Sequence, residues 1–348
     1  MAHEISRINA KPGTCESANR KRSEPDKEPT APVIESRTVP SHYTVEVHFI
    51  TDLKHNSYFG EQTEDRVAYA MLFMHSVSLR LQQLEPPVRI GLAAVEGLKT
   101  NPSYMKLYPD GDLIGDRTLD DLIQYVNNNE VPKKSDLVYM STGLDIKYGT
   151  DPSKYVSLAG ITTTGQACRK DKVAIGQDTP DTFSGVQTAA HEIAHLLGAP
   201  HDGEGDAKNC SSQDGYIMST HEGGKNGLTF SDCTKKAVAQ FFEKPGSECL
   251  RKEILCYVIS LPNKAADLPG DVMDGPTFCS KYYPKGKYKS STYIKVDSDL
   301  NRCLFRCLVE SKRLPRRAMN VTPFAVDGTP CSQSEPRKVC KSRICVEP

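Results

Sequence analysis

The pattern of apolar and polar positions changes at about residue 39. Residues 1–38 are rich in Lys, Arg, Glu and Pro and carry almost no apolar pattern, which is typical of a flexible tail or a processed pro-segment remnant. Over Tyr43–Phe49 apolar residues alternate with polar ones, which predicts a strand. Over Arg66–Leu84 the apolar residues recur at helical spacing, which predicts a helix.

Further along the chain, short apolar runs alternate with helical patterns. We expect more strands at 88–95, 137–140 and 156–161, and more helices at 119–126, 188–197 and about 231–242. This alternation predicts an α/β layer with a mixed or mostly parallel sheet. Beyond residue 250 the chain becomes loop-rich. We therefore expect a tail over 1–38, an α/β domain over 39–250 and a small second domain over 251–348.

Charge and length exclude two classes of function. The 348 residues contain 44 basic and 44 acidic side chains, so the chain lacks the basic footprint of a nucleic-acid-binding protein. No apolar run approaches the ~20 residues that a membrane span needs. The partner is therefore expected to be another protein, and the oligomeric state stays open.

Cysteines indicate the compartment. Seven of the 12 cysteines lie beyond residue 250, which predicts a disulfide-stapled domain and an oxidising environment. Two glycosylation sequons, at Asn209 and Asn320, agree with this. Met1–Ala10 shows no signal peptide, so either the protein is cytosolic or the sequence is a fragment that begins downstream of the true start. The cysteines favour a secreted, extracellular protein.

The strongest chemical pattern runs from His191 to His201. His191 and His195 are four residues apart on the expected helix, so both imidazoles lie on one face and can share one metal ion. Gly198 permits the sharp turn after which His201 can return as a third nitrogen ligand. Three protein ligands and an open fourth position describe a catalytic zinc site, since a structural site would be closed by four.

Glu192 follows the first histidine and is placed to hold a water molecule rather than the metal. Zinc lowers the pKa of a bound water towards ~7, and Glu192 would then accept its proton as general base and pass it to the leaving amine. A lone His-Glu-x-x-His pair also occurs on ordinary helices, but the coincidence of the glycine and the third histidine favours the zinc site.

The extended motif resembles that of the metzincin proteases. Asp202, which follows the third histidine, is what the reprolysin (adamalysin and ADAM-TS) branch carries, and Met218 matches the methionine turn beneath the zinc. The resemblance covers about 39–250 and implies an α/β metzincin catalytic domain: a mixed twisted sheet, long helices and a zinc cleft. Together with one cysteine-rich module, the layout resembles the salivary metalloproteases of ticks.

The resemblance also implies residues around the site. Leu158, Ala159 and Gly160 match the family's edge strand, to which an extended peptide substrate can add as another strand; an ordinary buried strand is the alternative. The resemblance implies two disulfides, one between Cys168 and Cys249 and one between Cys210 and Cys233. Residues 325–346 resemble the cysteine-rich region of ADAM-TS proteases, a module that binds substrate away from the active site.

Two further sites are implied by incomplete matches to the family's motifs. Glu46 and Asp136 match carboxylates of the family's calcium site, although the usual amide-bearing ligand after Cys249 is absent; plain surface carboxylates are the alternative. Cys15, in Lys11-Pro12-Gly13-Thr14-Cys15, resembles a degenerate cysteine switch in which a pro-segment thiolate holds the zinc's open position. A stray cysteine in a basic, solvated tail is the alternative there.

We therefore expect a secreted zinc endopeptidase that uses one catalytic Zn²⁺ and hydrolyses peptide bonds of extracellular matrix, plasma or host proteins. A catalytically weak binding protein, acting through its cysteine-rich module, is the competing hypothesis. The retention of Glu192 and of all three histidines argues against it.

Overall fold

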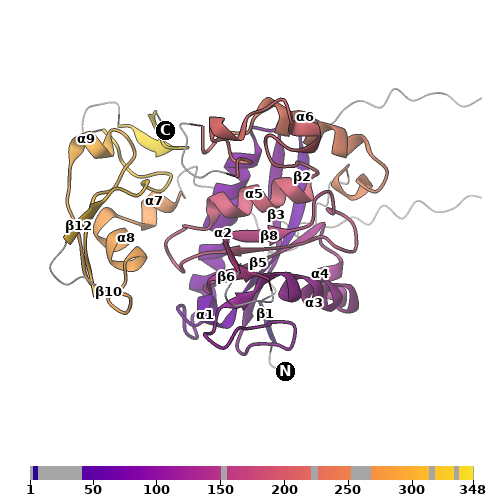
Figure 1. Ribbon diagram of the computed structural model, residues 1–348, viewed down its shortest axis with the longest axis horizontal. Coiled ribbons are helices and arrows are strands. Elements are labelled where there is room, and N and C mark those ends of the chain that lie inside the picture. Colours follow the sequence, from indigo (N-terminus) through magenta and orange to yellow (C-terminus); the bar gives the residue numbers. More distant parts are fainter. Residues whose placement is uncertain are drawn as a thin grey trace, which may run out of the picture.

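A six-stranded sheet forms the centre of the larger part of the molecule (Figure 1). The computed structural model describes residues 3–6, 41–149, 155–220, 226–251, 268–312, 318–332 and 337–347. In sheet order the strands are β1 (His3–Ser6), β3 (Val88–Leu98), β2 (Tyr43–Thr51), β5 (Leu137–Thr142), β9 (Val173–Gln177) and β8 (Gly160–Thr162). The four central strands are parallel and the two edge strands antiparallel, which confirms the expected mixed sheet.

Helices cover both faces of this sheet. On one face, α2 (Thr63–Leu81) and α5 (Val186–Leu196) share a core with Val47 and Phe49 of β2. On the other face, α3 (Gly115–Asn128) packs over a second core that contains Ile50 of the same strand. Because both faces are covered, β2 and β5 are buried at almost every position, including polar residues such as His48.

Shorter elements complete this part of the chain. They are α1 (Leu53–Asn56), β4 (Leu113–Ile114), α4 (Glu130–Lys133), β6 (Ile146–Tyr148), β7 (Val156–Leu158), α6 (Asp232–Glu243) and the 3₁₀ turns η1 (Gly205–Ala207), η2 (Ser212–Asp214) and η3 (Glu248–Arg251). Strands β4, β6 and β7 form a small sheet of their own.

The structure differs from the expected elements in four places. The helix predicted over 66–84 ends at Leu81, and Leu84 reaches the core from the turn that follows. The strand predicted over 156–161 is divided at Ala159, whose carbonyl accepts a hydrogen bond from the Gln177 N–H, so that β7 and β8 belong to different sheets. Strand β9 was not predicted. Within the polar segment 1–38, four residues form β1, because the edge of β3 offers free backbone groups.

The C-terminal region, residues 268–347, has its own small core (Figure 1). Its elements are α7 (Pro269–Val272), α8 (Gly275–Tyr282), β10 (Tyr288–Tyr293), α9 (Asp297–Leu300), β11 (Cys307–Ser311), β12 (Ala318–Val321), β13 (Val339–Lys341) and β14 (Ile344–Val346). Three disulfides cross-link this core, joining Cys279 to Cys307, Cys303 to Cys340 and Cys331 to Cys345. No helix in the described residues is long and apolar enough to span a membrane.

Candidate metal centre and catalytic cleft

Helix α5 ends in a turn that only glycine fits. The N–H of Gly198 donates to the carbonyl of His195 and that of Ala199 to the carbonyl of Ala194, the paired bonds of a left-handed helix end. Gly198 has a φ of +93°, and a Cβ there would lie 2.9 Å from the Cβ of Phe241. Conformation and space therefore both require glycine, and the chain turns back beneath the helix.

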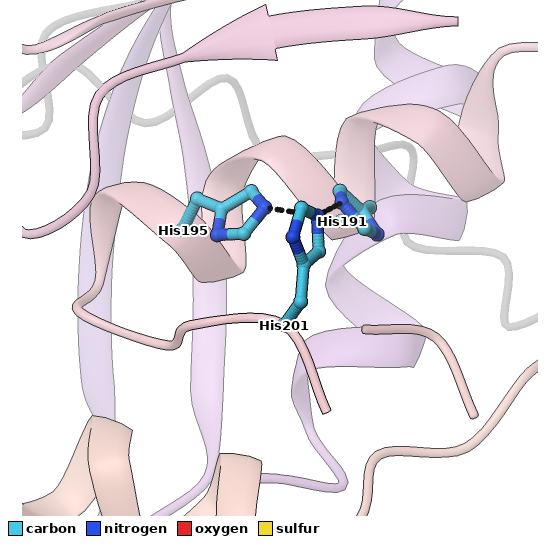
Figure 2. A group of neighbouring side chains, drawn as sticks. All are labelled: His191, His195 and His201. Atoms are coloured by element: carbon cyan, nitrogen blue, oxygen red, sulfur yellow. Dashed lines mark hydrogen bonds between the residues drawn. The ribbon is translucent and has the colours of Figure 1, made fainter. Parts of the chain in front are cut away.

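This turn brings three histidines together (Figure 2). His191 and His195 project from α5, and His201 approaches them from the loop after the turn. The Nε2 atom of His201 lies 3.3 Å from that of His191 and 3.1 Å from that of His195. Tetrahedral zinc at its usual bond length holds neighbouring nitrogens about 3.3 Å apart, so the spacing fits zinc.

The protonation of the rings supports the same fit. Nδ1 of His191 lies 2.7 Å from the Ile217 carbonyl, and Nδ1 of His195 lies 2.7 Å from the Ala199 carbonyl. A carbonyl only accepts, so each Nδ1 carries the proton. Burial, above all, lowers the pKa of His191 to about 4 and that of His195 to about 3, which keeps both rings neutral.

Neutral rings with a proton on Nδ1 direct the Nε2 lone pairs at one another. Nδ1 of His201 faces the carboxylate of Glu204 at 3.4 Å, which favours the same tautomer in the third ring. Converging lone pairs repel unless a cation lies between them. The donor set is therefore that of a zinc site whose ligands are each oriented by an oxygen on the far side of the ring.

Glu192 lies beside the histidines in a cleft of about 950 Å³. Its side chain is buried, and burial raises its pKa to about 8. It passes over Gly160 of β8, where a Cβ would lie 2.6 Å from Oε1 of Glu192. The structure thus leaves room at Gly160 for the carboxyl group.

The loop that carries His201 is tied to α6. Asp202 is buried; its N–H donates to the carbonyl of Met218, and its Oδ1 accepts from the hydroxyl of Ser231 at 2.5 Å. That hydroxyl also caps α6 by accepting from the N–H of Thr234. Met218 is fully buried in the core next to the Ile217 carbonyl that orients His191. Asp202 and Met218 therefore help to fix the loop that carries His201 and the Ile217 carbonyl that orients His191.

Disulfides hold the same region. One joins Cys210, on the loop after the third histidine, to Cys233 in the first turn of α6. Another joins Cys168 to Cys249. These are the two pairs that the resemblance implied.

The residues expected to receive substrate line the same cleft as Glu192. Gly160 belongs to β8, the last strand in the sheet order, so one side of this strand has no neighbour among the described strands. Leu158 belongs instead to β7 and Ala159 connects the two. An extended peptide could add along this edge.

One anchoring residue was not identified from the sequence. Asp178 is buried beyond β9; its Oδ2 accepts from Tyr69 at 2.6 Å and pairs with His55 at 2.8 Å. Its Oδ1 accepts from the N–H of Gly185, immediately before α5. Asp178 therefore fixes the start of the helix that carries the histidines. The sequence offered no sign of it, since two of its partners, His55 and Tyr69, lie more than 100 residues away.

The remaining candidates lie elsewhere. Glu46 and Asp136 are buried neighbours, with the Glu46 N–H donating to Asp136 Oδ2 at 2.9 Å, so they are not surface carboxylates. Burial, followed by the charge of Asp136, raises the pKa of Glu46 to about 7. The ammonium of Lys172 lies close by, donating to the carbonyls of Lys133 and Ser135. Cys15 lies outside the described residues.

Comparisons with known proteins match the region of the chain that contains this site. The family model of the reprolysin (M12B) zinc metalloproteases matches residues 46–253. The venom metalloproteinase antarease-like TserMP_B of Tityus serrulatus is 30% identical over 226 residues, 59% of this chain and 95% of that protein. The venom metalloproteinase antarease TserMP_A of the same organism is 30% identical over the same share of this chain but 57% of its own length.

A longer human relative shares less of its length. A disintegrin and metalloproteinase with thrombospondin motifs 18 of Homo sapiens is 29% identical over 225 residues, 62% of this chain and 16% of that protein. Among solved structures, a chain of a chaperone–substrate complex gives a TM-score of 0.35 at 13% identity, covering 48% of this chain and 26% of that one, which is too low to inform the fold. The match to the family model spans well over half of the sequence. The chain therefore belongs to the reprolysin (M12B) family of zinc metalloproteases.

Proposed function

We propose that this zinc metalloendopeptidase is secreted and hydrolyses extracellular or host proteins, with His191, His195 and His201 as zinc ligands and Glu192 as general base. The observation that carries the proposal is the convergence of three Nε2 atoms whose rings each direct Nδ1 at an oxygen acceptor. Such an arrangement binds a metal and leaves one coordination position for a water molecule.

Each residue of the cleft then has a distinct task. The three histidines would hold zinc, which would supply a water of lowered pKa and polarise the substrate carbonyl. Glu192, buried beside the three histidines, accepts a proton from the attacking water and returns it to the leaving amine. Gly160 and its neighbours along β8 hold the peptide extended beside Glu192.

Substitution of Glu192 tests this assignment. Glu192→Ala should fold and hold zinc in the wild-type ratio, because Glu192 is not a ligand, and should lose kcat by about 10²-fold or more on a fluorogenic peptide. Asp206→Asn is the matched control, because it neutralises an exposed carboxylate in the loop that follows His201. This variant should keep the wild-type rate. A Glu192→Ala enzyme with most of the wild-type kcat would refute the assigned base.

Secretion and the class of substrate rest on separate support. Five disulfides in the described residues need an oxidising compartment. Asn209 and Asn320 of the two sequons are both exposed, as glycan acceptors must be. Relatives are named as venom metalloproteinases. Mass-spectrometric mapping of cleavage sites in plasma and matrix proteins would identify the substrates, and an absence of cleavage in all of them would refute this class.

For calcium we propose at most weak binding at Glu46 and Asp136. The two buried carboxylates supply fewer oxygens than the six to eight that calcium takes, and Lys172 already donates to the adjacent carbonyls. Millimolar calcium should raise the melting temperature of the wild type slightly and leave that of Glu46→Gln unchanged. Equal shifts in both proteins would show that calcium does not act at this pair.

A further inference from the structure

The C-terminal region forms part of the wall of the catalytic cleft. The cavity that contains Glu192 and the histidines is also lined by Phe324, Asp327 and Arg343. The sequence resemblance implied a module that binds substrate away from the active site. Instead, side chains of the C-terminal region share one cavity with the catalytic residues, so they can contact the same stretch of peptide.

Two ionic contacts hold this wall in place. Arg80 of α2 lies 2.6 Å from Asp327, and both side chains are buried. At a second point, Lys281 of α8 pairs with Asp181, whose Oδ2 also accepts from the hydroxyl of Tyr58 at 3.1 Å. Because the contacts lie on different elements, they fix the orientation of the C-terminal region as well as its distance from the cleft.

Arg343 lies at the tip of a hairpin that the first contact also anchors. The pairing of β13 with β14 leaves a two-residue turn, Ser342-Arg343, in which both residues have positive φ, 52° and 63°. Glycine and asparagine suit such a turn, so these two residues store strain. The turn is held because the Ser342 N–H donates to Asp327 at 2.8 Å and its hydroxyl accepts from Arg80 at 3.1 Å.

The guanidinium of Arg343 has free donors in this cleft. It lies over the ring of Phe324, 3.6 Å from the ring centre, while its Nε and Nη1 are buried and have no hydrogen-bond partner among the described residues. Burial, followed by the nearby charge of Arg80, lowers the pKa of Arg343 to about 10, which leaves the guanidinium charged at neutral pH. The two arginines share one carboxylate, Asp327, which is already paired with Arg80. Among the described residues, one of the two positive charges therefore has no carboxylate of its own.

We propose that Arg343, stacked on Phe324, is a subsite for an acidic side chain of the peptide substrate. The planar guanidinium presents parallel N–H donors that match the two oxygens of a carboxylate. Stacking on an aromatic ring keeps that plane fixed before substrate binds, so little rotamer entropy is lost on binding. The strained turn and its two anchors are explained if they serve to aim this side chain into the cleft.

The inference rests on the proposed peptidase function and is tested with peptides. A positional library should show one position at which Asp or Glu raises kcat/KM roughly 10- to 100-fold over Asn or Gln, the range of a buried charge-assisted hydrogen bond. Arg343→Gln should abolish this preference, so that kcat/KM for the acidic peptide falls to that for the matched amide peptide. Arg343→Gly removes the side chain and relieves the positive φ, so it should lose the preference equally and fold at least as well.

Lys341→Gln is the matched control. It removes one positive charge from the same hairpin, but its side chain is exposed and does not line the cleft, so the acidic preference should persist. A wild-type enzyme that cleaves the library without acidic preference, or Arg343 variants that retain it, would overturn the subsite and leave the peptidase assignment intact. A wild-type enzyme that cleaves no peptide and matches Glu192→Ala would overturn the proposed function itself.

Discussion

Gly160→Ala is expected to reduce catalysis without touching a metal ligand. A Cβ at this position would lie 2.6 Å from Oε1 of Glu192, 2.8 Å from its Cγ and 2.8 Å from a methyl carbon of Thr188. Ordinary contact begins at 3.4 Å, so the carboxyl oxygen must move by about 0.8 Å. Misplacement of a catalytic group by that distance can cost about 10²-fold in rate. The overpacked contact should also lower stability by about 1–3 kcal/mol.

The assay separates positioning from binding and folding. We expect kcat to fall by about 10²-fold with KM and zinc content nearly unchanged, since the added methyl meets Glu192 and Thr188 and none of the histidines. Gly286→Ala is the control, because nothing lies within 4 Å of its Cβ and its φ is not positive. That variant should keep the wild-type kcat and gain slightly in stability.

A double variant identifies the cause. In a Glu192→Ala background the contacts to Oε1 and Cγ are gone and only Thr188 remains, so Gly160→Ala should lose less stability than it does in the wild type. Equal losses in both backgrounds would refute the clash with Glu192. A raised KM with an unchanged kcat would also refute it, by showing that the methyl group blocks the substrate instead.

Three further predictions concern the turn, the wall and latency. Gly198→Ala should destabilise the protein by about 1–3 kcal/mol in urea unfolding, because of its φ of +93°, and an unchanged midpoint would contradict this. Asp327→Asn should lower the free energy of unfolding by about 3–5 kcal/mol, because it leaves Arg80 buried without its charge partner. A double variant that also carries Arg80→Met should recover much of this loss. Equal stability of the single and the double variant would contradict the ion pair. If Cys15 is a cysteine switch, the form that keeps residues 1–22 should turn over a fluorogenic peptide more slowly than one that begins at Ser23, and Cys15→Ser should relieve it. Equal rates would make Cys15 a plain tail cysteine.

The sequence predicted the parts of the site that are local. Spacing on one helix determines that His191 and His195 share a face, and Gly198 determines where the chain turns, so both could be inferred from a dozen residues. Capping of α6 by Ser231 is local in the same way. In each case the partner lies within a few positions, and the physics of helix geometry decides the outcome.

Contacts over long sequence separations could not be predicted. Asp178 is an ordinary acidic residue in the sequence, and its importance comes from His55 and Tyr69, which the fold brings to it. Strand β9 is a run of five residues, too short to distinguish by periodicity. The division at Ala159 depends on a hydrogen bond from Gln177 in a neighbouring strand. These features depend on tertiary packing, which no local pattern encodes.

The proposed catalytic residues and the proposed subsite are held by different hydrophobic cores, so substrate preference can change independently of the metal site. The histidines and Glu192 are fixed by α5 and the main cores, whereas Phe324 and Arg343 belong to a region with its own core and three disulfides. Because different cores hold the two sets of residues, we expect replacement of a wall residue such as Arg343 to leave the metal geometry unchanged. The enzyme could then change the peptides it prefers through residues of the C-terminal region alone, as long as Arg80 and Asp327 keep that region against the cleft.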